Sequence, residues 1–313
     1  MAVPPGLRRA RLSGLRKGVT NALPRRAALI VNAKSRKGRH LFREACRLLR
    51  AAGVELVTTD AVRDPARFAE SVRSAVQAGA PMVIVGGGDG SISSSVDHVV
   101  GTDTVFAVLP LGTANSFART LGIPLDLPGA VDVIAGGRVR QIDLGMIDGD
   151  YFANCATIGI APQVAETVPH GLKAWLGRPG YLLWAAWQLA RFEGFQLTIG
   201  EGDAVETMTA VEVRIANGPF HGGVELVDGA RLDSGRIVVQ VVTGATRRSL
   251  VWSWALSMLR LPTRERTTRD FTGAAIRIAT TPPLPISIDG ELLATTPVTA
   301  RIARQAIGVA APR

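Results

Sequence analysis

A glycine-rich turn with a single carboxylate follows one of the apolar runs in the N-terminal half of the chain. Val83-Ile84-Val85 leads directly into Gly86-Gly87-Gly88-Asp89-Gly90-Ser91, and a helix is expected over Ile92–Val99. Glycines let the backbone approach a ligand closely, and the free N–H groups at a helix start are donors to an anion. Asp89 cannot itself favour a phosphate unless a divalent metal lies between them or the carboxylate binds another group. The turn predicts a phosphate site, with a plain strand–turn–helix corner as the alternative; it is neither a Walker loop nor a G-x-G-x-x-G motif.

A second polar turn follows the next apolar run. Val105–Leu109 leads into the stretch Pro110-Leu111-Gly112-Thr113-Ala114-Asn115-Ser116-Phe117-Ala118-Arg119. Hydroxyl and amide side chains at such a place can cap the following helix, but capping does not explain two successive junctions of this kind. Ligands of open α/β sheets bind at the carboxyl ends of strands. The two turns are therefore expected to serve one site.

Two carboxylates near the C-terminus are candidates for acid–base chemistry. Asp289 and Glu291 flank Gly290 after the strand-like run Ile286–Ile288. Carboxylates at the turn of a strand can project into a cleft and accept a proton. The alternative is an ordinary Asp-Gly hairpin turn with a solvated glutamate, and the residues alone favour this alternative.

The elements that position these residues can be read from hydrophobic periodicity. Within residues 27–136 the pattern predicts strands over 27–31, 54–58, 81–85 and 105–109, and helices over 38–52, 64–78 and 92–99. A β-α-β-α-β-α-β order with fully apolar strands indicates a parallel sheet covered on both faces. Residues 27–136 are thus expected to form an α/β nucleotide-binding domain.

The pattern changes near residue 137. Strands are expected over 141–147, 151–158, 195–199, 209–217, 236–243, 274–279 and 286–288, with helices over about 172–192 and 247–259. This predicts a second, β-rich and sandwich-like domain over residues 137–313. The last segment of the chain is expected either to stay in this domain or to return to the first one.

The charge of the chain is unevenly distributed. Of the formal +10, residues 1–26 hold seven basic side chains and no acid, which leaves +3 for the rest. These residues are expected to form a basic, disordered tail that is either solvated or attracted to anionic lipid. No aromatic residue is interleaved with the charges, so nucleic acid is not an expected partner.

The remaining composition points to a cytoplasmic protein. Cys46 and Cys155 are far apart in sequence, which is typical of a reducing compartment. The four histidines, which include His221, lack the paired spacing of a zinc site and are expected to have ordinary roles. No apolar run approaches the roughly 20 residues of a spanning helix, so any membrane contact is expected to be peripheral.

Taken together, the motifs resemble the diacylglycerol-kinase catalytic family, which includes sphingosine kinases and bacterial soluble lipid kinases. The markers, in chain order, are Asn32-Ala33-Lys34-Ser35, Gly87-Gly88-Asp89-Gly90, Pro110–Arg119 and Asp289-Gly290-Glu291. The match runs from about residue 27 to the C-terminus. The resemblance implies an architecture like that of NAD kinases, with ATP held between an α/β domain and a β-rich domain. It also implies a Mg²⁺-assisted transfer of the γ-phosphate to a hydroxyl of diacylglycerol, a sphingoid base or a related lipid.

The resemblance also implies roles for single residues. Glu291 is the first choice as general base and Asp289 the second, while Asp89 would hold Mg²⁺ or orient the nucleotide. Thr59, expected just after the second strand, would be a further nucleotide contact. The full set of implied nucleotide contacts is Asn32, Ser35, Thr59, Gly87, Gly88, Asp89, Gly90, Ser91, Gly112, Thr113 and Asn115.

The chain also departs from the family pattern. The family commonly has Thr at the position of Ser91 and Asn-Glu at Ser93-Ser94, and its Asp-Asp-Gly metal motif appears here as Asp233-Ser234-Gly235. A structural Mg²⁺ at that motif would have Asp233 as its remaining acid. Two alternatives stay open: an NAD kinase-type enzyme, which shares the Gly-Gly-Asp-Gly turn, and a non-catalytic nucleotide or lipid sensor, which Ser94 and Ser234 suggest.

Two features of the sequence indicate contact with lipid: the tryptophans and the basic tail. All five tryptophans fall in or beside the two predicted helices of the second domain: Trp175, Trp184, Trp187, Trp252 and Trp254. Core packing is one reading, and a mouth that admits an acyl chain is the other. The expected partner is a lipid substrate at the inner membrane face, reached through the tail and these helices. The oligomeric state is left open, with a homodimer as one option.

Overall fold

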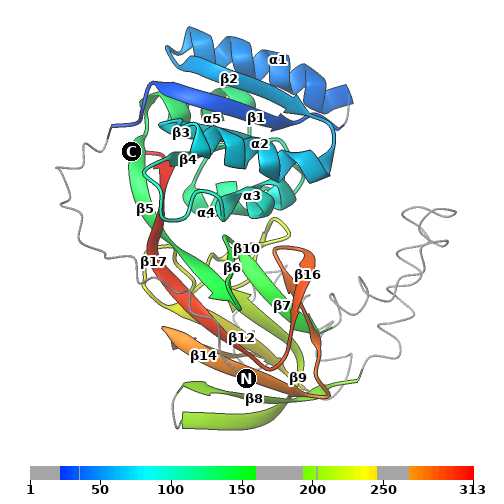
Figure 1. Ribbon diagram of the computed structural model, residues 1–313. Coiled ribbons are helices and arrows are strands. Elements are labelled where there is room, and N and C mark those ends of the chain that lie inside the picture. The colour runs from blue at the N-terminus through cyan, green and yellow to red at the C-terminus, as the bar shows by residue number, and fades with distance from the viewer. Residues whose placement is uncertain (1–21, 35, 160–192, 202–203, 245–267) are drawn as a thin grey trace, which may run out of the picture.

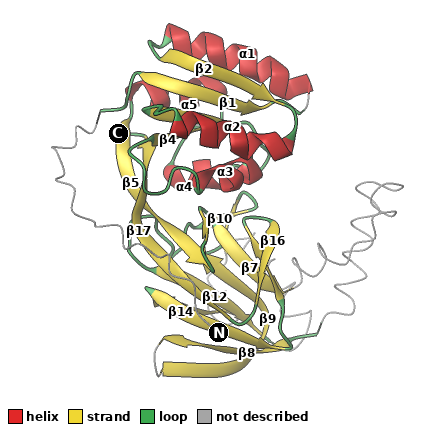
Figure 2. Cartoon of the chain, in the orientation of Figure 1, coloured by secondary structure: helices red, strands yellow, loops and turns green. Residues whose placement is uncertain are grey.

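The computed structural model describes residues 22–34, 36–159, 193–201, 204–244 and 268–313. The predicted helices over 172–192 and 247–259, all five tryptophans, Ser35 and most of the basic tail lie outside these residues. The described part divides into an α/β domain and a β-rich domain, joined by two long strands, and its helices all lie in the first domain (Figures 1 and 2).

The first domain is a parallel sheet with helices on both faces. Its strands are β1 (Arg26–Asn32), β2 (Glu55–Val62), β3 (Met82–Gly87) and β4 (Val105–Pro110), in the order β2-β1-β3-β4. The helices are α1 (Arg36–Ala51), α2 (Pro65–Gln77), α3 (Asp89–Val96), α4 (Ser116–Leu121) and α5 (Leu127–Gly136). Helix α1 packs beside α5 and α2 beside α3, so that each pair covers one face, as right-handed crossovers require. This coverage explains why β3 and β4 are buried along their whole length.

The second domain is built from antiparallel strands around a separate apolar core. Its strands are β5 (Arg138–Ile147), β6 (Asp150–Phe152), β7 (Cys155–Gly159), β8 (Phe195–Glu201), β9 (Ala204–Ala216), β10 (Phe220–His221), β11 (Val224–Glu225), β12 (Ile237–Thr243), β13 (Thr268–Gly273), β14 (Ala275–Thr281), β15 (Pro285–Ile288), β16 (Glu291–Thr295) and β17 (Val298–Ala311). Ile158, Val213 and Ile286 are among the fully buried residues of this core. The expected fold class, an α/β domain followed by a β-rich one, is confirmed.

One predicted strand is wrong in detail. The run 151–158 forms two strands, β6 and β7, rather than one. The backbone N–H groups of Ala153, Asn154 and Cys155 donate to the carboxylate of Asp289. Because these donors face a side chain from a distant hairpin, the chain turns between the two strands at this point.

The last strand joins the two domains. β17 runs antiparallel to β5 for most of its length, and its Val309 pairs in parallel with Phe106 of β4. Ile307 and Val309 lie in the apolar core of the first domain. One sheet is therefore continuous through both domains (Figure 1).

Candidate active site

The N-terminus of α3 lacks the side-chain cap that α2 and α5 have. Asp64 caps α2 by accepting from the backbone N–H of Ala66 at 3.0 Å, and Asp126 caps α5 through Gly129 at 2.8 Å. At α3 the capping position is Gly88, which has no side chain to offer. The first N–H groups of α3 consequently stay available to an anion.

Helix α3 also begins earlier than the sequence pattern predicts. The expected start was Ile92, but the helix begins at Asp89. The shift follows from Gly88, whose extended backbone allows it to act as the capping residue directly after β3. Asp89 and Gly90 thereby belong to the first helical turn, where the free N–H groups are.

A cavity of about 380 Å³ opens in front of this helix start. Asn32, Phe68, Gly88, Gly90, Ser91, Ser94 and Glu291 line it. All but one of these residues come from the first domain, and Glu291 is contributed by the β15–β16 hairpin of the second. The structure thus brings the predicted glycine turn, the first loop and one of the two late carboxylates to one place between the domains.

The glycines of the turn are required for different reasons. A Cβ on Gly87 would collide with the side chain of Ser91, and one on Gly112 would lie 2.5 Å from the Cα of Gly88. Close packing within the first turn therefore explains Gly87, and close packing of the two turns explains Gly112. A Cβ on Gly90 would meet nothing within 4 Å, although a glycine inside a helix costs about 1 kcal/mol relative to alanine. The fold does not require Gly90, but a ligand that approaches the backbone would.

Side chains from the first loop and the second turn hold this arrangement. The amide nitrogen of Asn32 donates to Ser91 Oγ at 3.2 Å, which ties the end of β1 to α3. Asn115 is buried in the left-handed region (φ 50°), and both of its amide atoms bond to Gly112, at 2.9 and 3.0 Å. Asn115 therefore shapes the loop from within, while Thr113 is exposed.

Asp89 connects the two turns. Its Oδ1 accepts a hydrogen bond from the backbone N–H of Phe117, in the first turn of α4, at 3.2 Å. A carboxylate at a helix N-terminus is favoured by the helix dipole. Asp89 thus fixes the relative position of α3 and α4, and only one of its two oxygens is used for this purpose in the described part of the chain.

Thr59 does not join the other expected contacts. Strand β2 extends to Val62, so that Thr59 lies inside the strand and not after it, as the sequence pattern predicted. In the register of the sheet Thr59 pairs with Leu29, whereas Asn32 pairs with Val62. Three residues of strand correspond to about 10 Å, which places exposed Thr59 well short of the carboxyl edge.

Asp289 is held by backbone donors. Its two carboxylate oxygens accept from the N–H groups of Ala153, Asn154 and Cys155 at 3.0, 3.2 and 3.0 Å. Asp289 and Gly290 both have positive φ (45° and 100°), as in the two-residue turns that favour Asp-Gly. The hairpin turn expected as an alternative is therefore present, and its aspartate anchors the hairpin to the β6–β7 turn. Glu291 is left exposed at the cavity.

The environment of Asp289 changes its acidity. Burial raises the pKa of this carboxyl from 3.8 to about 6; the three backbone hydrogen bonds act in the opposite direction, and the nearby charge of Asp89 adds a smaller upward contribution. The loss of water around the carboxylate outweighs the hydrogen bonds that stabilise its charged form.

This shift predicts a pH-dependent stability. The carboxyl of Asp289 binds its proton more tightly in the folded than in the unfolded protein. The contribution of this proton to the free energy of unfolding is therefore complete below about pH 4 and is lost as the pH rises through about 6. Asn cannot titrate in this way. We therefore compare the free energies of unfolding of the unmodified protein and Asp289→Asn. Their difference, unmodified minus variant, should fall by on the order of 2–3 kcal/mol between about pH 4 and pH 7. Urea unfolding at each pH measures it. Parallel pH profiles for the two proteins would contradict the assignment.

His221 lies near Asp89 and the second turn, a placement that the sequence pattern does not indicate. The β10–β11 hairpin that carries it packs on the second turn, where the N–H of Gly223 donates to Ser116 Oγ at 3.1 Å. Burial lowers the pKa of His221, and the charges of Glu212, Arg214 and Asp89 are near enough to influence it. The imidazole is thus expected to be neutral at pH 7. No local pattern marks this residue, because only tertiary packing brings it near Asp89.

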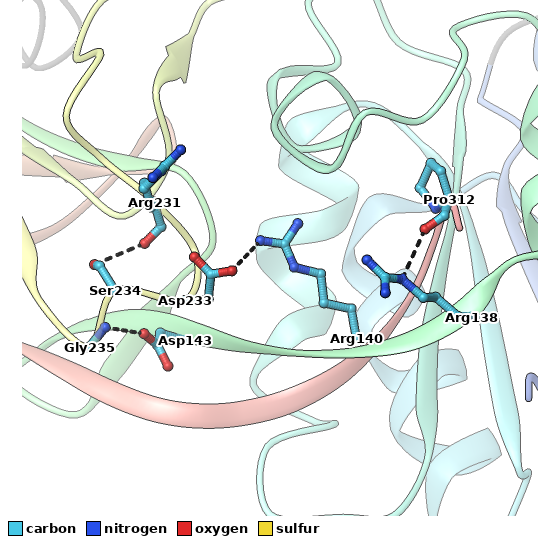
Figure 3. A network of polar contacts seen from close by, with 8 residues as sticks. All are labelled: Arg138, Arg140, Asp143, Arg231, Asp233, Ser234, Gly235 and Pro312. Atoms are coloured by element: carbon cyan, nitrogen blue, oxygen red, sulfur yellow. Dashed lines mark hydrogen bonds and ion pairs between the residues drawn. The ribbon is translucent and has the colours of Figure 1, made fainter. Parts of the chain in front are cut away.

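The two predicted metal ligands differ in their suitability. Mg²⁺ in nucleotide sites is bound through one or two carboxylates together with phosphates, and Asp89, with an oxygen to spare, fits a metal that arrives with a nucleotide. Asp233 does not fit: its Oδ2 accepts from Arg140 Nη2 at 2.7 Å (Figure 3). Within the described ranges no three His, Cys, Asp or Glu side chains gather as a metal-binding group. The role of Asp233 as a metal ligand therefore stays a prediction, and its pairing with Arg140 argues against it.

Comparisons with known proteins agree with this architecture. Residues 26–147 match the diacylglycerol kinase catalytic domain, and residues 154–311 match the YegS C-terminal NAD kinase beta sandwich-like domain. The probable lipid kinase YegS of Escherichia fergusonii is 32% identical over 225 residues, which are 69% of this chain and 74% of that protein. The protein sll0036 of Synechocystis is 29% identical over 248 residues, 75% of this chain and 55% of that protein.

A solved structure extends the comparison to the whole fold. The crystal structure of a diacylglycerol kinase from Bacillus anthracis superposes with a TM-score of 0.71 at 20% identity, covering 91% of this chain and 96% of that one. The two matched domains define the class, which combines a diacylglycerol kinase catalytic domain with an NAD kinase-like β-sandwich domain. The chain belongs to the diacylglycerol kinase catalytic-domain family, and the expectation of a kinase is confirmed at this level. None of the helices that the structure describes is long and apolar enough to cross a membrane.

Proposed function

We propose that the protein transfers the γ-phosphoryl group of ATP to a hydroxyl of a membrane lipid alcohol of the diacylglycerol type. The observation that carries the proposal is the position of Glu291, a second-domain carboxylate that lines the same cavity as the uncapped start of α3. A phosphate donor site and an exposed base in one cavity are what transfer to an alcohol requires.

The residues of the chain divide the work. The N–H groups of α3 and the open space at Gly90 would receive the phosphates, and Asp89 would hold the Mg²⁺ that accompanies them. Bound ATP would supply the phosphoryl group, and the Mg²⁺ ion would neutralise part of the phosphate charge. Glu291 accepts the proton of the lipid hydroxyl. At the same time the hydroxyl oxygen forms a new bond to the γ-phosphorus, and the bond between the γ-phosphorus and the ADP oxygen breaks. Asp289 positions the hairpin that presents Glu291.

The acceptor is proposed to arrive along β16. Leu292 and Leu293 directly follow Glu291 and are 40% and 49% exposed, on a strand at the edge of the sheet. Exposed apolar side chains beside a site are typical of contact with an apolar partner, and acyl chains are such a partner.

Replacement of both leucines by glutamine should therefore weaken the lipid interaction. We expect the KM for a lipid in mixed micelles to rise by about tenfold, which corresponds to roughly 1.4 kcal/mol of lost apolar contact, while the KM for ATP is unchanged. Val205→Gln is a matched control, because Val205 is 53% exposed on the β8–β9 hairpin and does not line the cavity. An equal effect of the control, or none from the leucines, would argue against this path.

The function is tested with the purified chain, labelled Mg-ATP and a panel of acceptors. Diacylglycerol, monoacylglycerol and a sphingoid base are supplied in mixed micelles, and NAD is supplied in solution. Label in a lipid phosphate supports the proposal. Label in NAD alone would favour an NAD kinase-type enzyme, and nucleotide binding with no transfer to any acceptor would favour a non-catalytic sensor.

A further inference from the structure

The segment 231–236 joins the two domains through a buried carboxylate. Leu232 lies in the core of the first domain, although the loop connects strands of the second. Asp143 of β5 is only 3% exposed; its backbone N–H donates to the carbonyl of Leu232 at 2.6 Å, and its Oδ2 accepts from the N–H of Gly235 at 2.7 Å. Its Oδ1 accepts from the N–H of Gln305 of β17 at 2.8 Å. One side chain thus ties the loop to both connecting strands.

The polar side chains on the exposed side of the same loop have hydrogen-bond partners within the chain. Arg140, three residues before Asp143 on β5, donates to Asp233 at 2.7 Å. The hydroxyl of Ser234 donates to a neighbouring carbonyl, that of Arg231 or that of Arg236, and accepts from the N–H of Arg236 at 3.2 Å. Figure 3 shows the guanidinium of Arg140 directed at the carboxylate of Asp233.

We propose that the guanidinium of Arg140 takes the place of a divalent cation at this loop, so that the junction of the two domains is held without a metal. The resemblance to the family implies a metal at an Asp-Asp-Gly sequence, and here the second acid is Ser234. One exposed carboxylate and one guanidinium already balance in charge. A Mg²⁺ ion at Asp233 would add two positive charges beside this guanidinium. The other carboxylate at the loop, that of Asp143, is buried and already accepts from the N–H groups of Gly235 and Gln305.

The position of Arg140 shows what a guanidinium in place of a metal ion achieves. In the ladder Arg140 pairs with Val309, the residue of β17 that also pairs with Phe106 of the first sheet. A fixed positive charge at this crossing anchors the loop at every metal concentration, because arginine is never deprotonated in proteins. This inference does not depend on the proposed function.

Thermal unfolding of the full chain without nucleotide tests the proposal. The unmodified protein should have the same Tm in EDTA and in Mg²⁺, while Arg140→Gln should lower Tm by about 2–4 °C in both. Arg138→Gln is the matched control: among the described residues the side chain of this exposed arginine of the same strand donates only to the carbonyl of Pro312, at 3.3 Å. The change should shift Tm by no more than about 1 °C. A Tm of Arg140→Gln equal to that of the unmodified protein would overturn the proposal.

A second measurement does not require Arg140→Gln to fold. Mn²⁺ binding, followed by electron paramagnetic resonance, is compared between the unmodified protein and Asp233→Asn without nucleotide. Equal numbers of bound ions are expected, because Asp233 holds no metal. One more ion bound by the unmodified protein, or a Mg²⁺-dependent rise in Tm that Asp233→Asn abolishes, would show that the loop is a metal site.

Discussion

Replacing Glu291 by glutamine is expected to lower kcat by about 10²–10⁴-fold, the range of a lost general base, and to leave ATP affinity unchanged. The side chain of Glu291 is exposed at the cavity and forms no hydrogen bond or ion pair with another described residue, whereas its backbone pairs with Ile288 in the hairpin. Glutamine keeps the shape of the side chain but cannot take up a proton. Turnover with the best lipid acceptor and the Kd of an ATP analogue are the two measurements.

The comparison needs a control for the loss of one negative charge. Glu206→Gln serves this purpose, because Glu206 is an exposed glutamate of β9 that pairs with Arg269 at 2.8 Å and does not line the cavity. Its turnover should match that of the unmodified protein, since an exposed ion pair contributes little. Full activity of Glu291→Gln would move the base elsewhere, and Asp289→Asn would then be the next variant to assay.

Replacing Gly90 by alanine is expected to weaken ATP binding by about tenfold to a hundredfold, the cost of roughly 1.4–2.8 kcal/mol when a methyl group meets a bound phosphate. The same change should raise the free energy of unfolding by up to about 1 kcal/mol, because alanine is the better helix former and its Cβ would meet no protein atom. Loss of binding together with gain of stability is a signature that simple damage to the fold cannot produce. Calorimetric titration and urea unfolding report the two quantities.

Gly136→Ala provides the matched control for this pair of effects. Gly136 is the last residue of α5, and a Cβ there would also meet nothing within 4 Å. The control should leave ATP affinity unchanged, because Gly136 does not line the cavity. If Gly90→Ala binds ATP as tightly as this control does, the nucleotide does not approach the start of α3.

The sequence determined those features that depend on neighbouring residues. Apolar runs and helical spacing predicted β1, β3 and β4 because a strand covered on both faces must be apolar throughout. The two glycine turns could be recognised because a strand, a turn and a helix start follow one another along the chain. The order of these elements, with the β-rich pattern after residue 137, was enough to predict the two domains.

The pairing register of the strands and the packing of the elements determined the positions of the other site residues. Glu291 reaches the cavity only because β15 pairs with β7 and the aspartate before it binds three N–H groups about 135 residues away. Thr59 fell short of the site because β2 continues three residues past it. His221 and the pair Arg140–Asp233 gave no signal, since their partners are distant in sequence. Periodicity reports which face of an element is apolar, whereas the partner of a polar side chain is chosen by how the finished elements pack.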